Sequence, residues 1–336
     1  MKKIGIAVII IDVCACICFF IFYGPISGFR DWLVTTSMTT MTHKYIAKTF
    51  YSEKMIDDVL SKNYIEDFSE STNVNEIQIG NIKEIDSYTS IYEREILEHD
   101  ENDNYKIIEF DYNGSHVFLA VLYDPSRVSL GMTEYLGVQG EFLRDISKKN
   151  NALVAINAGG FSDEGGFGNG GSPTGIVIKD GKIIWSGGYY YGKLAGFNYD
   201  NVLVLTSDSP SVAIEKGMRD AIEFGPFLIV NGIEANIGGN GGWGINPRTA
   251  LAQRKDGIVL FLVADGNGYN SDWSARGGLG LADVMAILKR YGAYNAVNLD
   301  GGASTTLVVN NDLYNKPCSG SSSTGERELP NGWIFK

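Results

Sequence analysis

The sequence predicts an α+β protein in which one globular domain, built on a mixed, partly parallel β-sheet with flanking helices, follows a transmembrane helix and a helical stalk. An apolar run opens the chain, short β-type runs dominate it from residue 105 onward, and a strand–helix–strand pattern occupies residues 257–300. Glycine supplies 41 of the 336 residues without a collagen-like period, which indicates a domain rich in tight turns.

The N-terminal run has the length and composition of a membrane anchor. Residues 4–23 are apolar apart from Asp12, and about 20 apolar residues are enough for a helix to cross a bilayer. Burying Asp12 costs roughly 2.5–3.5 kcal/mol, which the many Ile, Val and Phe residues offset. Lys2 and Lys3 precede the run, so the positive-inside rule places the N-terminus in the cytoplasm and the rest of the chain outside the cell. We therefore expect residues 1–25 to be a single-pass anchor in the cell membrane.

Two other interpretations of this run have less support. A cleaved signal peptide needs a small-x-small site, and residues 23–25 do not supply one. Lipid modification of Cys16 needs a polar segment after the cysteine, whereas residues 17–23 are apolar. The cysteines at 14, 16, 18 and 318 also give no internal disulfide framework, so they leave the redox compartment open.

Residues 26–65 are expected to form a helical stalk next to the membrane. Residues 42–63 place their apolar side chains on one helical stripe, which indicates packing against the domain, with self-association of the stalk as the alternative. Residues 66–104 contain twelve Asp or Glu residues against two basic ones and carry most of the formal net charge of −12. We interpret this segment as a solvated acidic linker with little regular structure. The domain is then expected to occupy residues 105–336.

Short runs of β-type residues predict strands through the first half of the domain, with one helix among them at 141–149. Each run is bounded by residues that favour turns. The predicted strands cover residues 107–112, 116–123, 153–156, 175–178, 202–205 and 227–230.

The strand–helix–strand pattern predicts where a ligand binds. The sequence GIVLFLVADG at 257–266 is a continuous apolar strand that ends in Asp265. An amphipathic helix at 281–291 follows, and a second short strand at 296–299 ends in Asp300. Such a unit makes a right-handed parallel crossover, so both strands point the same way and bring Asp265 and Asp300 to one carboxyl edge. Open sheets bind their ligands at that edge.

A third apolar strand, at 153–156, ends in the same manner with Asn157. Glycines at such strand ends let the backbone approach a ligand and present N–H groups to an anion such as phosphate. Taken one at a time, Asn-Gly and Asp-Gly pairs are also ordinary turn formers. The glycines concerned are Gly159, Gly160, Gly301 and Gly302.

Two arginines are the candidate phosphate ligands, Arg248 in NPRTALAQ first and Arg327 in GERELP second. The planar guanidinium group can bind two phosphate oxygens at once, although either arginine alone would more often be a surface ion-pair partner. Ser304 in DGGASTT is expected to donate a hydrogen bond in the site. The three histidines are scattered and give no zinc-site spacing, which disfavours zinc chemistry. The sequence has no basic patch, which disfavours nucleic acid as a partner.

These segments together resemble the phosphodiester glycosidase family, typified by the uncovering enzyme of lysosomal targeting, whose bacterial members are often labelled exopolysaccharide biosynthesis proteins. The resemblance covers roughly 105–336 and is carried by INAGGF, SPTGIVIKDG, FGPFLIVNG, NPRTALAQRKDGIVLFLVADG, NLDGG and NKPCSGSSSTGERELPNGWIF. The membrane-proximal residues also look like those of Gram-positive members. Two positions depart from the family pattern, Asn267–Gly268 after the VADG strand and Ala303 in DGGAS, and both put the substrate preference in doubt.

The resemblance implies cleavage of the bond between an anomeric carbon and a phosphodiester oxygen, with N-acetylglucosamine as the usual sugar. Our hypothesis makes Asp300 the first and Asp265 the second choice for the carboxylate that activates water or stabilises an oxocarbenium-like centre. Asn157 is expected to orient the sugar or one Asp. No cofactor is required, with calcium as an open alternative. A non-catalytic glycan-binding or envelope-assembly protein and a metal-dependent phosphodiesterase are the alternative functions, and the oligomeric state stays open.

Overall fold

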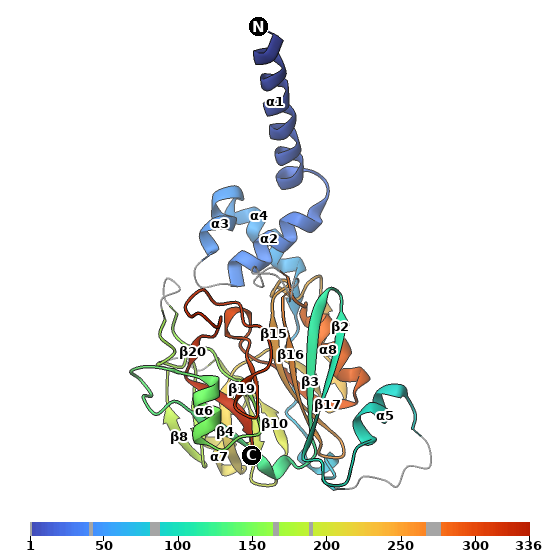
Figure 1. Cartoon of the computed structure of the whole chain (residues 1–336), viewed down its shortest axis with the longest axis vertical. Coiled ribbons are helices and arrows are strands. Elements are labelled where there is room, and N and C mark those ends of the chain that lie inside the picture. Colours follow the sequence, from blue (N-terminus) through green and yellow to red (C-terminus); the bar gives the residue numbers. More distant parts are fainter. Residues whose placement is uncertain (1, 40–42, 81–87, 164–167, 188–190, 267–276) are drawn as a thin grey trace.

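A long N-terminal helix projects away from the rest of the chain in the computed structural model, which describes residues 2–39, 43–80, 88–163, 168–187, 191–266 and 277–336 (Figure 1). This helix, α1 (Lys2–Tyr23), contains the one described segment long and apolar enough to cross a membrane, Gly5–Tyr23. No residue of the apolar window in that segment is fully buried, and near its C-terminal end Phe22 packs against the short helices that follow. One apolar N-terminal helix of this kind fits a signal anchor or a single-pass membrane protein.

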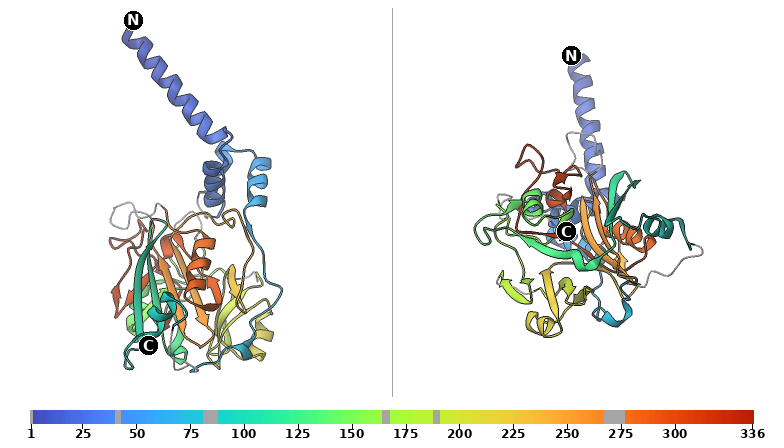
Figure 2. Two further views of the ribbon diagram at one scale, coloured as in Figure 1. Left: turned by 90° about the vertical axis from the view of Figure 1, so that its right-hand side faces the viewer. Right: turned by 60° about the horizontal axis from the view of Figure 1, so that its bottom comes forward.

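Short helices stand between α1 and the domain, α2 (Ser27–Thr39), α3 (Lys44–Phe50) and α4 (Glu53–Lys62) (Figures 1 and 2). The prediction of one helix over residues 42–63 is wrong, because the helix is interrupted between α3 and α4. Ser52 begins the next helix there, and its hydroxyl accepts a hydrogen bond from the Met55 N–H at 3.3 Å. The three helices bury a small core of their own around Val34, Ala47, Tyr51, Ile56 and Val59.

Three antiparallel sheets make up most of the domain. The largest contains β2 (Tyr105–Tyr112), β3 (Ser115–Leu122), β12 (Phe227–Val230), β13 (Ile233–Glu234), β15 (Arg248–Arg254), β16 (Val259–Ala264) and β17 (Ala293–Asn298). Its seven strands lie in the order β13-β12-β17-β15-β16-β3-β2. Predicted strands at 107–112, 116–123 and 227–230 correspond to β2, β3 and β12, with ends that differ by one or two residues at most.

The other two sheets have five strands each. One contains β7 (Val177–Lys179), β8 (Lys182–Trp185), β9 (Leu194–Asn198), β10 (Leu203–Thr206) and β11 (Met218–Glu223), in the order β10-β9-β11-β7-β8. The other contains β4 (Val128–Met132), β6 (Val154–Asn157), β18 (Leu307–Val309), β19 (Asp312–Leu313) and β21 (Asn331–Phe335), in the order β19-β18-β6-β21-β4.

Smaller elements complete the described structure. Two-stranded pairs join β1 (Tyr64–Ile65) to β14 (Ile237–Gly238) and β5 (Glu141–Phe142) to β20 (Glu328–Leu329). The helices of the domain are α5 (Ile91–Leu97), α6 (Leu143–Lys149), α7 (Pro210–Glu215) and α8 (Leu281–Arg290). Short 3-10 turns are η1 (Val74–Glu76), η2 (Pro125–Arg127) and η4 (Gly302–Ser304).

One apolar core joins the three sheets. Phe118, Phe197, Phe261 and Trp333 are almost completely buried and meet in it from β3, β9, β16 and β21. A second cluster covers the opposite face of the seven-stranded sheet, where α8 packs with its apolar side, as its sequence spacing predicted. Burial on both faces explains why β16 is apolar at every position rather than alternating.

The α+β class is confirmed, whereas the partly parallel pairing is wrong. Every described pair of neighbouring strands is antiparallel. The strand–helix–strand unit does place β16 and β17 in the same direction, but β15 lies between them and pairs antiparallel with both. The carboxyl ends of β16 and β17 therefore still share one edge, and the first residue of β15, Arg248, lies at that edge too.

The acidic segment at 66–104 is not a solvated linker throughout its described part. After α4 the chain runs down the side of the domain (Figure 2), and the Thr72 N–H donates to the Leu205 carbonyl at 3.0 Å. Ile77 and Ile96 are buried, the latter in the cluster beneath α5. Widely spaced apolar residues thus hold the segment on the domain while most of its described charged side chains stay exposed.

Candidate active site

A pocket of about 530 Å³ opens between α2 and the strand ends of the domain. This volume lies within the range of roughly 300–1,000 Å³ usual for small-molecule sites. Seven predicted residues line it, namely Gly160, Arg248, Asp300, Gly301, Gly302, Ser304 and Arg327. Asn157, Gly159 and Asp265 are not part of its described lining.

Asp300 lies where two sheets meet at the floor of the pocket. It follows β17 of the seven-stranded sheet, and its N–H donates to the carbonyl of Ala158, just after β6 of another sheet. Burial raises the pKa of the Asp300 carboxyl to about 6, and the Asp163 charge adds to the rise. The Ser304 hydroxyl, the Arg327 charge and the Gly301 N–H act in the opposite direction. A carboxyl with such a pKa can exchange protons near neutral pH.

Asn157 lies outside the described lining of the pocket and hydrogen-bonds the backbone of Asp300. Its side-chain amide donates to the Asp300 carbonyl at 2.6 Å, and its Oδ1 accepts from the Thr249 hydroxyl at 2.7 Å and the Thr306 N–H at 3.1 Å. Asn157 is 1% exposed, so all three bonds lie in the interior. Gly159 is likewise structural in this arrangement, because its N–H donates to Asn331 Oδ1 at 2.8 Å.

Asp163 and Arg327 form an ion pair in the pocket wall. Arg327 Nη1 donates to Asp163 Oδ2 at 2.9 Å, and the guanidinium carbon lies 4.5 Å from the centre of the Phe161 ring. Burial opposes ionisation of Asp163, but the Arg327 hydrogen bond and the Gly168 N–H outweigh it and lower the pKa of that carboxyl. The pocket therefore contains two carboxyl groups with opposite pKa changes, raised for Asp300 and lowered for Asp163. Such a difference is the pattern of an acid/base pair.

Arg248 is a buried cation in the pocket wall. Its Nε donates to the Leu279 carbonyl at 2.9 Å, and Nη2 donates to the carbonyls of Trp243 and Gly244 at 2.9 and 2.7 Å. Burial lowers the pKa of this guanidinium to about 10, with the Asp283 charge acting against the change. Among the described residues no carboxylate lies within ion-pair distance of it, so the pocket presents a positive charge that only neutral carbonyls solvate.

The glycine pair after Asp300 allows the chain to approach the segment before β15. The Gly302 N–H donates to the Pro247 carbonyl at 2.9 Å, and a Cβ at position 301 would lie 2.7 Å from that oxygen. Gly302 also has a positive φ of 59°. Gly301 therefore needs glycine for close packing and Gly302 for its left-handed backbone conformation, and both residues line the pocket.

Asp265 does not share the pocket wall with Asp300, contrary to the prediction that both acids line one rim. Its carboxylate accepts hydrogen bonds from Asn315 Nδ2 at 2.8 Å and from the Lys316 N–H at 2.9 Å. Burial raises its pKa to about 6. Asp265 lies on the shared sheet edge, but these bonds turn it toward the 315–316 loop. The family departure at Asn267–Gly268 lies outside the described residues.

Several lining residues were missed in the sequence. Asp163 follows the INAGGF segment closely, so treating the whole glycine loop as one unit would have included it. Phe161, Phe224 and Trp243 add aromatic surface, which no periodic pattern marked. Cys318 also lines the pocket, where burial and the Asp265 charge raise the pKa of its thiol to about 11. A thiol with this pKa is a poor nucleophile at neutral pH.

Comparison with known proteins gives a family and related folds. Residues 150–336 match the family model described as phosphodiester glycosidase. The N-acetylglucosamine-1-phosphodiester alpha-N-acetylglucosaminidase of Bos taurus is 26% identical over 192 residues, which are 52% of this chain and 34% of that protein. The SPbeta prophage-derived uncharacterized protein YomE of Bacillus subtilis is 26% identical over 206 residues, which are 59% of this chain and 30% of that protein.

A solved structure supports the fold. The catalytic domain of zebrafish N-acetylglucosamine-1-phosphodiester alpha-N-acetylglucosaminidase, auto-inhibited by its pro-peptide, aligns with a TM-score of 0.56 at 22% identity. The alignment covers 70% of this chain and 85% of that one. In sequence, by contrast, the chain spans only about a third of the length of the curated relatives it matches.

The fold and the pocket define an α+β protein with an enzyme-type site, in which paired carboxyl groups and arginines lie at the strand ends. The family match extends over more than half of the sequence. The chain therefore belongs to the phosphodiester glycosidase family.

Proposed function

We propose that this protein is a hydrolase that removes a sugar, N-acetylglucosamine, from a sugar-1-phosphodiester of a cell-envelope polymer or glycoconjugate. The observation that carries the proposal is the pocket itself. Asp300, with a pKa raised to about 6, shares it with the buried cation of Arg248, which has no carboxylate partner among the described residues. Family membership and the N-acetylglucosamine-specific names of the mammalian relatives supply the sugar and the bond.

Arg248 and the backbone of Gly301 and Gly302 are the proposed phosphate ligands. A phosphodiester has one full negative charge, and this wall of the pocket offers one cation without a carboxylate partner among the described residues. As the anomeric bond breaks, the leaving phosphate gains a second charge. A positive group fixed in a largely dry site stabilises that added charge more than it stabilises the substrate.

Asp300 is the proposed base. Ionised Asp300 takes a proton from a water molecule, the water oxygen forms a bond to the anomeric carbon, and the carbon–oxygen bond to phosphate breaks. The electron pair of the broken bond goes to the leaving phosphate monoester, which needs no strong acid because phosphate is already a good leaving group. Asp163 stays ionised beside Arg327 and is proposed to stabilise positive charge at the sugar ring. Arg327 positions Asp163, and Asn157 and Asp265 position the chain around the site.

We also propose that α1 anchors the protein in the cell membrane with the domain outside. The support is the exposed apolar segment Gly5–Tyr23 together with the lysines that precede it. Protease added to intact cells should then degrade the domain and leave a protected fragment shorter than 30 residues or so. Full protection of the domain would place it inside the cell.

The test of function uses the purified full-length chain in detergent, because α2 lines the pocket. We expect free N-acetylglucosamine from an N-acetylglucosamine-1-phosphodiester, and in heavy-oxygen water the label should enter the sugar. Label in the phosphate would instead indicate a phosphodiesterase, and no release from several such donors would indicate a binding protein.

The reaction is proposed to need no cofactor. Within the described ranges no group of three or more His, Cys, Asp and Glu side chains is placed to hold a metal ion. Calcium remains the alternative, because it prefers carboxylate and amide oxygens. Exhaustive dialysis against a chelator should leave the rate of sugar release unaltered, and recovery of a lost rate by calcium alone would establish the alternative.

A further inference from the structure

The stalk holds the pocket near the end of the apolar helix α1. Thr36 of α2 and His43 line the same pocket as Asp300. Between Tyr23, the last residue of α1, and Ser27, the first of α2, a fully extended chain spans at most about 14 Å. The helical rise from Ser27 to Thr36 adds about 14 Å. The pocket wall at Thr36 therefore lies within about 28 Å of the end of α1, whatever the angle between α1 and the domain.

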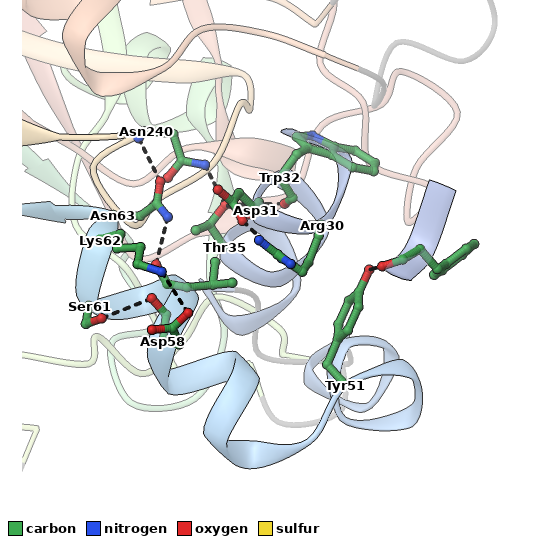
Figure 3. Close-up of polar contacts among 12 residues, drawn as sticks. Arg30, Asp31, Trp32, Thr35, Tyr51, Asp58, Ser61, Lys62, Asn63 and Asn240 are labelled. Atoms are coloured by element: carbon green, nitrogen blue, oxygen red, sulfur yellow. Dashed lines mark hydrogen bonds and ion pairs between the residues drawn. The ribbon is translucent and has the colours of Figure 1, made fainter. Parts of the chain in front are cut away.

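Hydrogen bonds connect the stalk to α1 on one side and to the domain on the other. The Tyr51 hydroxyl donates to the Phe22 carbonyl of α1 at 3.2 Å (Figure 3). On the domain side, Asn240 Nδ2 donates to the Thr35 hydroxyl at 2.7 Å, and the Asn240 N–H donates to Asn63 Oδ1 at 3.0 Å. Thr35 and Asn63 are buried, and satisfied buried hydrogen bonds make a contact rigid. The stalk therefore joins the pocket to α1 as a folded unit.

Aromatic side chains continue from α1 onto the stalk. The centre of the Phe22 ring lies 5.1 Å from that of Phe29 in α2 and 4.6 Å from that of Phe50 in α3. Trp32 follows, with its ring centre 5.7 Å from that of Phe29. Even so, Trp32 and Phe50 are 41% and 40% exposed, and Tyr45 of α3 is 64% exposed. Trp and Tyr gather at the boundary between lipid and water, so this position next to a membrane-type helix suits them.

The same part of the stalk has the charge that suits lipid phosphate groups. Lys44 and Lys48 of α3 are exposed and one helical turn apart, and α3 contains no acidic residue. Together Trp32, Lys44, Tyr45, Lys48 and Phe50 form the stalk surface. Helices that combine basic and aromatic side chains in this way lie in the membrane interface. Self-association through the stalk surface would instead bring the lysines of two copies together, which like charge opposes.

We propose that the stalk surface rests on the outer face of the membrane, and that the enzyme hydrolyses a phosphodiester whose leaving alcohol is anchored in the same leaflet. The inference rests on the proposed function and on the anchor proposed with it. The bond that breaks is the one described above, and the phosphate monoester stays with the lipid. Headgroups extend roughly 5–8 Å beyond the hydrocarbon core, so the pocket wall is at most roughly 20–25 Å from them. A substrate confined to that layer has a high effective concentration at the pocket.

The first test measures the membrane contact without any substrate. Full-length protein is placed in nanodiscs of phosphatidylcholine and phosphatidylglycerol, with and without a phosphatidylcholine that has a nitroxide quencher on its headgroup. The quencher should reach Trp32, so wild type should lose more tryptophan fluorescence than Trp32→Phe. Trp333→Phe, in the buried core, is the matched control and should lose none of the quenched fluorescence. Equal quenching of wild type and Trp32→Phe would refute the contact.

The second test compares sugar release from two donors by the full-length protein in the same nanodiscs. One donor is the soluble methyl ester of N-acetylglucosamine 1-phosphate, and the other is its dioleoylglycerol ester within the nanodisc. Wild type should prefer the lipid ester in kcat/KM. Lys48→Gln should lower the lipid-to-methyl ratio about fivefold, the effect of one lysine at an anionic surface, and Lys48→Arg should keep it. Lys182→Gln, exposed in β8, is the matched control and should also keep it.

Different outcomes separate this inference from the function it rests on. If neither ester releases sugar, the proposed function fails and the choice of substrate fails with it, while quenching still decides the membrane contact. If wild type cleaves both esters equally well, the lipid-anchored substrate is refuted and the function stands. A preference that Lys48→Gln leaves unchanged would come from α1 alone and would refute the role of the stalk surface. In nanodiscs of phosphatidylcholine alone the effect of Lys48→Gln should disappear, because the surface then has no net charge.

Discussion

Replacing Asp300 by Asn should abolish turnover and at the same time stabilise the fold at neutral pH. The carboxyl has a pKa of about 6 in the folded protein, against 3.8 for the ordinary group, and burial is the largest cause. At pH 7 the folded protein therefore holds an ionised carboxylate in a site that stabilises the charge less well than water does. The Asn side chain has nearly the same shape, and its oxygen can still accept from Ser304 and Gly301, so the substitution removes the charge and little else.

The size and sign of the effect follow from linkage. One pKa unit corresponds to about 1.4 kcal/mol, so at pH 7 the shift costs wild type about 3 kcal/mol of stability. Because the folded pKa of this acid is raised, the cost develops as the pH rises from about 4 to about 6. At pH 4 it falls below about 1 kcal/mol, since Asp300 is then protonated when folded and roughly 40% protonated when unfolded.

Thermal unfolding of the full-length protein in detergent measures this directly. We expect the Tm of Asp300→Asn to exceed that of wild type by roughly 6–12 °C at pH 7 and the difference to shrink toward zero at pH 4. Asp312→Asn, at an exposed position in β19, should show no such trend. A variant that is less stable than wild type at pH 7, or a difference that does not vary with pH, would refute the reasoning about burial. Near-normal sugar release would remove Asp300 as the base.

Three further outcomes test the site. If ionised Asp300 is the base, kcat/KM should rise with pH up to an apparent pKa near 6 and then level off, whereas a fall through that range would make Asp300 a proton donor. Arg248→Met should raise the KM for a phosphodiester about 10- to 100-fold in steady-state kinetics while inhibition by free N-acetylglucosamine changes little, because only the phosphate loses its charged partner; equal loss of both would indicate a collapsed pocket. Asn157→Ala should lower the free energy of unfolding in guanidinium by about 2–4 kcal/mol, because it leaves the Asp300 carbonyl, Thr249 and Thr306 without their buried partner, and a loss below about 1 kcal/mol would show that Asn157 has no such role.

Local patterns in the sequence were sufficient for several of the elements and for one edge of the site. The apolar run at 257–264 and the helical stripe at 281–291 are properties of neighbouring residues, and both appear as β16 and α8. Because α8 covers the sheet between two strands of the same direction, the ends of β16 and β17 had to share an edge. That argument placed Asp300 correctly at the pocket, whereas Asp265, which it placed beside Asp300, is not part of the described lining. The glycine motif after Asp300 marked a close backbone approach in the same way, because Gly301 lies against the Pro247 carbonyl.

Tertiary structure alone decided which side chains face the pocket. The insertion of β15 between β16 and β17 depends on pairing between residues far apart in the sequence, and no periodicity records it. For the same reason, the sequence does not show that Asp265 binds Asn315 instead of lining the pocket. Nor does it show that Asp163, which is ion-paired with Arg327, lies in the pocket wall. The stalk shows the point most clearly. Thr36 of α2 lines the pocket, and contacts distant in sequence place it there, because Asn240 donates a hydrogen bond to Thr35 and Gly244 packs against Thr36. Hydrophobic periodicity is a property of adjacent residues, whereas the composition of a site depends on contacts that form only when distant segments pack together.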